Sequence, residues 1–161
     1  MPTIEQVRAW AADFERSYPE ELPDRLRWFV EDLGVRPGPL LRLMGASREE
    51  AEQLADGGVD WDWAVNHFGE ESAWWAESVI GQALVHYQYD WKALRDRLAR
   101  PLDKELDMDV PELGGRFTPL RSLPPDRRED VLLGQVAQGG PGSTLALIAY
   151  LCQPEGVPAR P

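Results

Sequence analysis

Cysteine is nearly absent from this chain of 161 residues, which has only Cys152. A single cysteine excludes an internal disulfide, and with it the small secreted folds that disulfides hold together. Long apolar runs are also missing, because the longest, residues 145–152, has eight residues and a membrane span needs roughly 18. The first residues lack the basic start and apolar stretch of a signal peptide. These absences predict a soluble, cytoplasmic protein.

Histidine is scarce as well, with only His67 and His86. His67 is followed by Glu70 and Glu71, but Gly69 is expected to end the helix and to break the spacing that a zinc site on one helix uses. Neither G-x-S-x-G nor G-x-G-x-x-G occurs, and the glycine-rich stretch at residues 139–144 lacks the lysine of a phosphate-binding loop. The sequence therefore predicts no catalytic residue, no metal site and no cofactor.

Negative charge is concentrated in the first half of the chain, whose total formal charge is −11. Residues 1–80 have 17 acidic and 7 basic side chains, a net of −10, whereas residues 81–161 have 11 acidic and 10 basic, a net of −1. An acidic surface repels phosphate backbones, so general nucleic-acid binding is disfavoured. Two interpretations stay open: the acidity keeps the protein soluble, or it attracts a basic protein partner.

Tryptophan is abundant, and five of the seven tryptophans lie between Trp61 and Trp91. This residue is enriched in cores and also at binding hot spots, and for a helical bundle we favour the core. Basic side chains gather later in the chain, where they form either a docking patch or, as we favour, an ordinary solvated helix surface. They are Lys92, Arg95, Arg97, Arg100, Arg116, Arg121, Arg127 and Arg128.

Apolar residues recur at helical spacing through most of the chain, between glycines and prolines that punctuate the pattern. Thr3 with Gln6, and Ser47 with Glu50, have the spacing of capping boxes. The pattern predicts helices over residues 4–17, 22–33, 39–44, 48–56, 61–68, 70–87, 91–99, 124–138 and 143–153.

A different pattern occupies residues 105–110, where apolar residues alternate with acids as in a strand. Gly114 and Gly115 supply a turn, after which residues 116–120 return as a second short strand or an extended arm. Pro119 restricts that segment to the edge of a sheet, because proline has no N–H to donate. We therefore expect a short β-hairpin or extended arm near residues 105–120.

Residues 37–56 have the spacing of a helix-turn-helix motif, with Gly45 at the turn. In a DNA-binding protein the second helix would meet the bases and phosphates. Here Arg48 is the only base on that helix, and it is outnumbered by Glu49, Glu50, Glu52 and Asp56. We interpret the segment as a packed helical hairpin with no DNA-binding residues.

Together these patterns predict a mainly α fold, a helical bundle with a helix-turn-helix-like hairpin and the short β element. The expected parts are an N-terminal helical lobe at residues 1–58, a helical C-terminal lobe at residues 59–153 and a frayed tail at residues 154–161.

Residues 111–120, PELGGRFTPL, followed by VLLGQV at residues 131–136 and by Gly139, resemble the toxin-binding domain of Xre/MbcA/ParS-type antitoxins. Residues 89–101, YDWKALRDRLARP, are similar to the helix that precedes that domain, and the helix-turn-helix-like hairpin lies on the expected N-terminal side. The resemblance covers about 50 residues. Phe117 interrupts the arginine–threonine junction of the family motif, and residues 102–110 look like an insertion before it.

The resemblance implies a non-enzymatic inhibitor that binds a partner toxin, often one that consumes NAD, and blocks its active site within a homo- or hetero-oligomer. Its toxin-binding segment would include the expected partner-binding residues Leu113, Arg116, Phe117, Leu120 and Arg121. DNA autoregulation, usual in the family, is not expected with so acidic a second helix. The alternative is an acidic helical adaptor or immunity-type subunit of a larger bacterial defence or regulatory assembly. That adaptor would not bind DNA, and it would use the acidic N-terminal half and the tryptophans as its contact surface.

Overall fold

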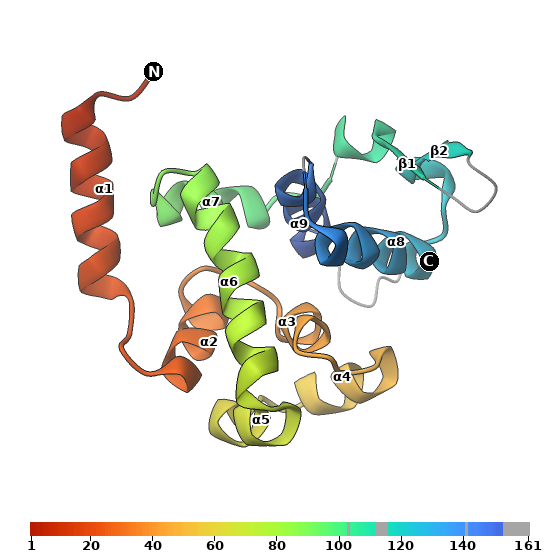
Figure 1. The fold of residues 1–161 in the computed structure, drawn as a ribbon, viewed down its shortest axis with the longest axis horizontal. Coiled ribbons are helices and arrows are strands. Elements are labelled where there is room, and N and C mark those ends of the chain that lie inside the picture. The colour runs from red at the N-terminus through yellow and green to blue at the C-terminus, as the bar shows by residue number, and fades with distance from the viewer. Residues whose placement is uncertain (103, 112–115, 141, 153–161) are drawn as a thin grey trace. The chain divides into compact units, whose positions relative to one another are not determined.

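The computed structural model describes residues 1–102, 104–111, 116–140 and 142–152. These ranges contain nine α-helices, two short 3₁₀ helices and one two-stranded antiparallel sheet, which confirms the mainly α fold (Figure 1). The chain divides into two compact units, residues 1–99 (unit 1) and residues 100–161 (unit 2). Across the described ranges, no helix has both the length and the apolar character that a membrane span requires.

Unit 1 consists of helices whose ends lie close to those that the sequence predicts. They are α1 (Ile4–Ser17), α2 (Leu22–Glu31), α3 (Pro37–Leu43), α4 (Arg48–Ala55), α5 (Trp61–Phe68), α6 (Glu70–His86) and α7 (Trp91–Leu98). Both expected capping boxes are present, since Thr3 with Gln6 and Ser47 with Glu50 each exchange two hydrogen bonds between side chain and backbone. Local hydrogen bonding therefore explains where α1 and α4 begin.

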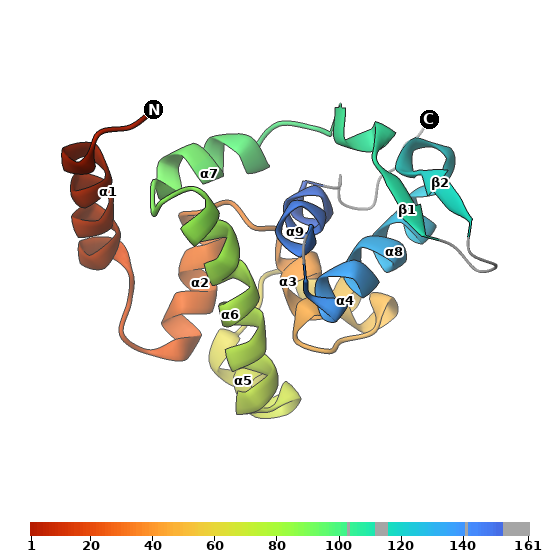
Figure 2. The ribbon, with the colours of Figure 1, turned by 45° about the horizontal axis from the view of Figure 1, so that its top comes forward.

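The boundary between the two units lies after residue 99, whereas the sequence pattern predicts a lobe boundary between residues 58 and 59. The reason is packing: α5 contacts α2, and α6 contacts α2, α3 and α5 (Figure 2). Phe29 of α2, Leu40 of α3 and Ile80 of α6 are all fully buried. The helices that follow residue 58 thus share one core with those before it. The expected tail at residues 154–161 lies outside the described residues.

A largely buried ion pair joins α2 to α6. Arg25 Nη1 lies 2.8 Å from Glu77 Oε2, and the two side chains are only 23% and 12% exposed. The Tyr18 hydroxyl donates to the same carboxylate oxygen at 2.7 Å, and Arg25 Nε donates to the Pro19 carbonyl at 2.8 Å. One carboxylate of α6 therefore holds both α2 and the segment that connects α1 to α2.

This network changes the pKa of Tyr18. Burial raises the pKa of the Tyr18 hydroxyl well above its ordinary value, the hydrogen bond to Glu77 and its negative charge raise it further, and Arg25 opposes the rise. Because the pKa is higher in the folded state, this contribution to stability is complete below the unfolded pKa of about 10 and is lost as the pH rises above it.

We expect the free energy of unfolding to fall as the pH rises above about 10. Tyr18 should contribute up to about 1 kcal/mol per pH unit to this fall, which is less than a fully buried group would contribute because its ring is partly exposed. Tyr18→Phe should remove that share of the slope. Urea unfolding of both proteins at about pH 9 and pH 11 measures it, and contributions common to the two proteins cancel in the comparison. An identical slope in the two proteins would contradict this assignment.

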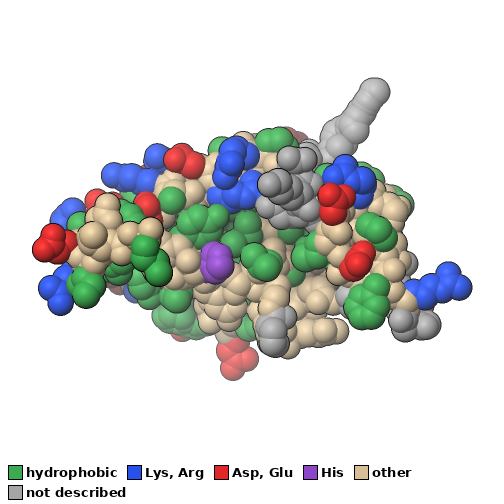
Figure 3. Space-filling model, turned by 90° about the horizontal axis from the view of Figure 1, so that it is seen from above, with side chains coloured by type: hydrophobic (Ala, Val, Ile, Leu, Met, Phe, Trp, Pro, Cys, Tyr) green, Lys and Arg blue, Asp and Glu red, His purple; other side chains and the backbone are tan. Residues whose placement is uncertain are grey.

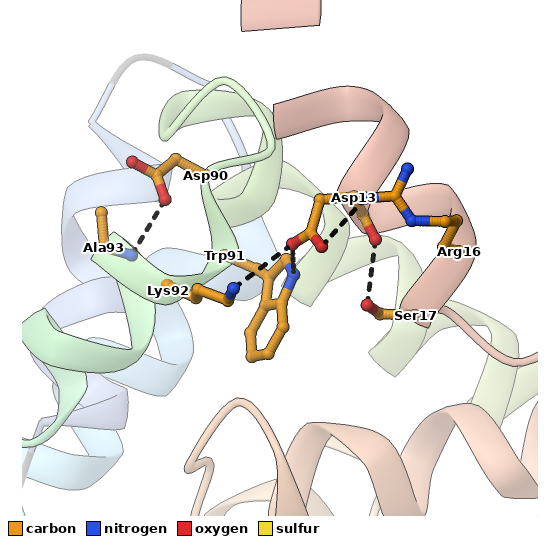
Figure 4. A network of polar contacts seen from close by, with 7 residues as sticks. All are labelled: Asp13, Arg16, Ser17, Asp90, Trp91, Lys92 and Ala93. Atoms are coloured by element: carbon orange, nitrogen blue, oxygen red, sulfur yellow. Dashed lines mark hydrogen bonds and ion pairs between the residues drawn. The ribbon is translucent and has the colours of Figure 1, made fainter. Parts of the chain in front are cut away.

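Helix α1 has no buried residue from Ile4 to Ser17, and the contacts described for it come from its C-terminal half. Asp13 Oδ2 accepts a hydrogen bond from Trp91 Nε1 at 2.9 Å and lies 3.9 Å from Lys92 Nζ (Figure 4). The Phe14 ring lies 5.2 Å from the Tyr89 ring, measured between centroids. Helix α1 is therefore held at one end, by α7, by the turn before it and, through the Phe14 and Trp28 rings, by α2.

Unit 2 contains the short 3₁₀ helices, the sheet and two helices. In chain order they are η1 (Lys104–Asp107), β1 (Asp109–Pro111), β2 (Phe117–Pro119), η2 (Leu120–Ser122), α8 (Pro125–Gln138) and α9 (Ser143–Leu151). Helices α8 and α9 pack against each other, and β1 pairs with β2 so that Val110 lies opposite Thr118. The expected β-hairpin is therefore present.

The first strand of this hairpin is shorter than predicted, since residues 104–107 form a 3₁₀ helix. The partner strand explains the difference: β2 passes directly into η2, so no extended residue remains to pair with the chain before Asp109. The two 3₁₀ helices contact each other instead. The Leu120 N–H donates to the Met108 carbonyl at 2.8 Å, and Arg121 Nε donates to Asp107 Oδ1 at 3.1 Å.

Candidate protein-binding surfaces

Phe117, one of the residues expected to bind a partner, is an exposed aromatic residue. Its side chain belongs to the first residue of β2, opposite Pro111 of β1, and the residue is 70% exposed. Arg116, which precedes it, is exposed as well. Aromatic residues and arginine are both enriched at protein interfaces.

The other three expected partner-binding residues have different positions. Arg121 is on the surface, where it pairs with Asp107, and Leu113 lies outside the described residues. Leu120 is fully buried, so its side chain is part of the core and does not face a partner. Arg128 of α8 reinforces this region, because its Nε donates to the Leu120 carbonyl at 3.2 Å. The buried leucine and the arginine together fix the base of the hairpin.

The basic residues from 92 to 128 are divided between the two units, with Lys92, Arg95 and Arg97 on α7 of unit 1. Lys92 pairs with Asp13, and both Lys92 and Arg95 lie over the Trp91 ring, 5.6 and 5.4 Å from its centroid. On the face drawn in Figure 3, basic side chains are interspersed with acidic and apolar ones. These contacts favour the interpretation of an ordinary helix surface over that of a docking patch.

The helix-turn-helix-like hairpin is formed by α3 and α4, which pack closely around a turn at Gly45. Its apolar residues are buried, among them Leu41 and Ala51. Glu49 and Glu52 of α4 are exposed, so negative charge lies on the surface that a DNA-binding hairpin would present to phosphates. We continue to expect no DNA binding by this element.

The tryptophans between residues 61 and 91 fall into two groups. Trp61 and Trp91 are buried, at 3% and 8% exposure, whereas Trp63, Trp74 and Trp75 are 43%, 46% and 41% exposed. The core interpretation therefore holds for only two of the five. Sequence reasoning missed a signal that the spacing of these tryptophans carries. Two residues that are two positions apart in a helix point about 200° apart around its axis, so Trp61 and Trp63 cannot both face the core.

A set of five side chains, which we call the aromatic–acidic surface, is defined by contacts around two of the exposed tryptophans: Glu50, Trp63, His67, Glu70 and Trp74. The His67 ring stacks on the Trp63 ring with centroids 4.5 Å apart and an interplanar angle of 12°. His67 Nε2 lies 3.5 Å from Glu50 Oε2, and Trp74 Nε1 donates to Glu70 Oε1 at 3.4 Å. The Trp74 indole thus has a carboxylate close by, whereas the Trp63 indole is linked to the Glu50 carboxylate through the His67 ring.

The two histidines do not share a site. His67 is near the C-terminal end of α5, and His86 is the last residue of α6, a helix of 17 residues that spans about 25 Å. Where the structure describes side chains, no group of three or more histidine, cysteine or acidic residues is suitably placed for a metal ion. Cys152 is buried at the end of α9.

Comparisons with protein-family models, with curated proteins and with solved structures give no match to this chain. Its function is therefore inferred from its own surfaces.

Proposed function

We propose that this protein is a non-enzymatic, antitoxin-like inhibitor that binds a partner toxin through the β1–β2 hairpin of unit 2. The exposure of Phe117 carries the proposal, since 70% of this residue is open to water. Burying an aromatic ring on association stabilises a complex by about 25 cal/mol for each Å2 of apolar surface removed from water. Arg116, which precedes it in the sequence, is exposed and supplies a charged group that can orient the partner.

The attachment of the hairpin to the rest of unit 2 supports the proposal. Leu120 directly follows β2 and is fully buried, and Arg128 holds two carbonyl groups of η2, those of Leu120 and Arg121, at 3.2 and 3.3 Å. A binding residue that is already fixed in place loses little conformational entropy when a partner binds. Phe117 therefore projects from a preformed support.

Coexpression with the products of adjacent genes tests the proposal, with purification of any complex and measurement of toxin inhibition. We expect a small neighbouring toxin to copurify and the wild-type chain to suppress its activity, for example its consumption of NAD. Phe117→Ala should weaken the complex by about 2 kcal/mol, or roughly 30-fold, because it removes a central aromatic contact. Inhibition should weaken in parallel.

Leu145→Ala is the matched control, because Leu145 is an exposed apolar residue of the same unit, at 56% exposure. It should leave binding and inhibition unchanged. Equal affinity of the wild type and the Phe117→Ala protein for the copurified toxin would overturn the proposal, as would a toxin that stays fully active when bound.

A second candidate function is that of an acidic helical adaptor within a larger assembly. The observation that favours it is the exposure of Trp63 and Trp74 on helices rich in carboxylates. Under this function, Trp63→Ala would release the partner and Phe117→Ala would not. The same copurification experiment therefore separates the two candidates.

A further inference from the structure

We propose that the aromatic–acidic surface of unit 1 binds an arginine-bearing segment of a partner protein, an inference that rests on the adaptor candidate above. The surface is formed by α5, the first two turns of α6 and Glu50 of α4. In the complex, guanidinium groups would lie on the Trp63 and Trp74 rings and pair with exposed carboxylates beside them, Glu70 above all.

The core does not require large apolar side chains at these positions. Trp61 and Ala64 form the buried face of α5, and Ala73 and Ala76 are fully buried on α6. Trp63 and Trp74 point away from these faces and remain 43% and 46% exposed. Exposed rings that do not fill a core are the surface that a partner would cover.

The charge around these rings selects a basic partner. No lysine or arginine occurs from residue 49 to residue 91, a stretch that contains ten carboxylates. Glu77 is occupied by its ion pair, and Asp60 and Asp90 accept the capping hydrogen bonds of α5 and α7. Glu50 is occupied as well, by the capping hydrogen bond of α4 and by His67. Others, among them Glu70 and Glu71, are exposed at the start of α6. A segment with positive charge would complement this surface, and an acidic one would be repelled.

The ring contacts favour arginine over lysine. His67 covers one face of the Trp63 ring, so the ring is oriented before a ligand arrives and its exposed part is available for stacking. A planar guanidinium stacks on an indole and binds a carboxylate with two N–H groups at once, which an ammonium group cannot do. Arginine therefore fits both components of the surface.

The chain already contains this arrangement in its interior. Arg25 lies over the Tyr18 ring, 5.0 Å from its centroid, while its Nη1 binds Glu77 at 2.8 Å. Ring, guanidinium and carboxylate thus occur together within one molecule. The aromatic–acidic surface offers the ring and the carboxylate, and the partner would supply the guanidinium.

Isothermal titration calorimetry with an oligoarginine peptide, at near-physiological salt, tests the inference on the full chain. We expect the double variant Trp63→Leu with Trp74→Leu, whose net charge is unchanged, to raise the Kd at least about tenfold. We also expect an oligolysine peptide of equal length to bind more weakly than oligoarginine. Circular dichroism checks that the variant is folded, and single substitutions at Trp63 and Trp74 replace the double one if it is not.

Glu70→Gln and Glu21→Gln form the matched pair for charge, because both glutamates are exposed and each change removes one negative charge. Only Glu70→Gln should weaken binding. Equal effects of the two changes, or no effect of the tryptophan substitutions, would show diffuse attraction to an acidic protein and would overturn the inference.

If Trp63→Ala releases a natural partner and oligoarginine does not bind, the adaptor function stands and the arginine chemistry fails. If oligoarginine binds as expected and no partner depends on Trp63, the adaptor function fails alone.

Discussion

Replacing Trp28 with alanine is expected to lower the free energy of unfolding by about 4 kcal/mol, the largest effect of a single substitution that we foresee. Trp28 is 6% exposed and lies at the centre of an aromatic cluster. Its ring is 5.1 Å from Trp91, 5.4 Å from Tyr18, 6.0 Å from Phe14 and 6.1 Å from Phe29, measured between centroids. Alanine would leave a cavity and remove the contacts that join α2 to α1 and α7.

Urea unfolding followed by circular dichroism measures this loss. Trp74→Ala is the matched control, since it removes the same side chain from a position that is 46% exposed, and we expect a change within about 0.5 kcal/mol. Similar losses for the two variants would mean that the division between buried and exposed tryptophans is wrong.

Removing the carboxylate of Glu77 is expected to cost about 3 kcal/mol of stability in Glu77→Ala. The reason is less the loss of attraction than the charge left behind. Arg25, only 23% exposed, would keep its hydrogen bond to Pro19 and lose its counterion, and the Tyr18 hydroxyl would lose its acceptor. A charge that is poorly solvated and unbalanced destabilises the fold more than a lost surface contact does.

Two comparisons make the Glu77 prediction specific. Glu71→Ala, at an exposed position on the same helix, should change stability by less than about 0.5 kcal/mol. The double variant Arg25→Met with Glu77→Leu should recover much of the loss, because apolar pairs often replace buried ion pairs at little cost. If the double variant is as unstable as Glu77→Ala, an unbalanced charge is not the cause.

Most helix ends could be predicted from the sequence, because short-range interactions determine them. Thr3 and Ser47 each satisfy backbone donors within three residues, and glycines with positive φ, such as Gly34 and Gly69, end the preceding helices. The 3₁₀ helix before β1 was not predicted, since the alternation of apolar residues and acids there says nothing about the length of the partner strand. Strand length is decided by a segment elsewhere in the chain.

The candidate site could be predicted only in part. Phe117 and Leu120 are both apolar and lie three residues apart, yet one is 70% exposed and the other fully buried. The family resemblance predicts that both residues bind a partner. A sequence motif contains residues that anchor the segment in the core as well as residues that contact a partner, and it does not tell the two kinds apart. The division of the units at residue 99 is likewise a property of packing between helices distant in the sequence, and local periodicity does not record it.

The attachment of α1 by its C-terminal half has a kinetic consequence. A helix of 14 residues with no buried side chain is only marginally stable by itself, so its first turns open and close many times during the lifetime of the folded core. We therefore expect the amide protons before Asp13 to exchange with deuterium through local fraying. Because fraying exposes little new surface, adding denaturant below the concentration that unfolds unit 1 should leave their exchange rate unchanged. We expect trypsin to cleave at the exposed Arg8 during these openings, and to cleave beside the ion-paired Arg25 only when the core itself unfolds.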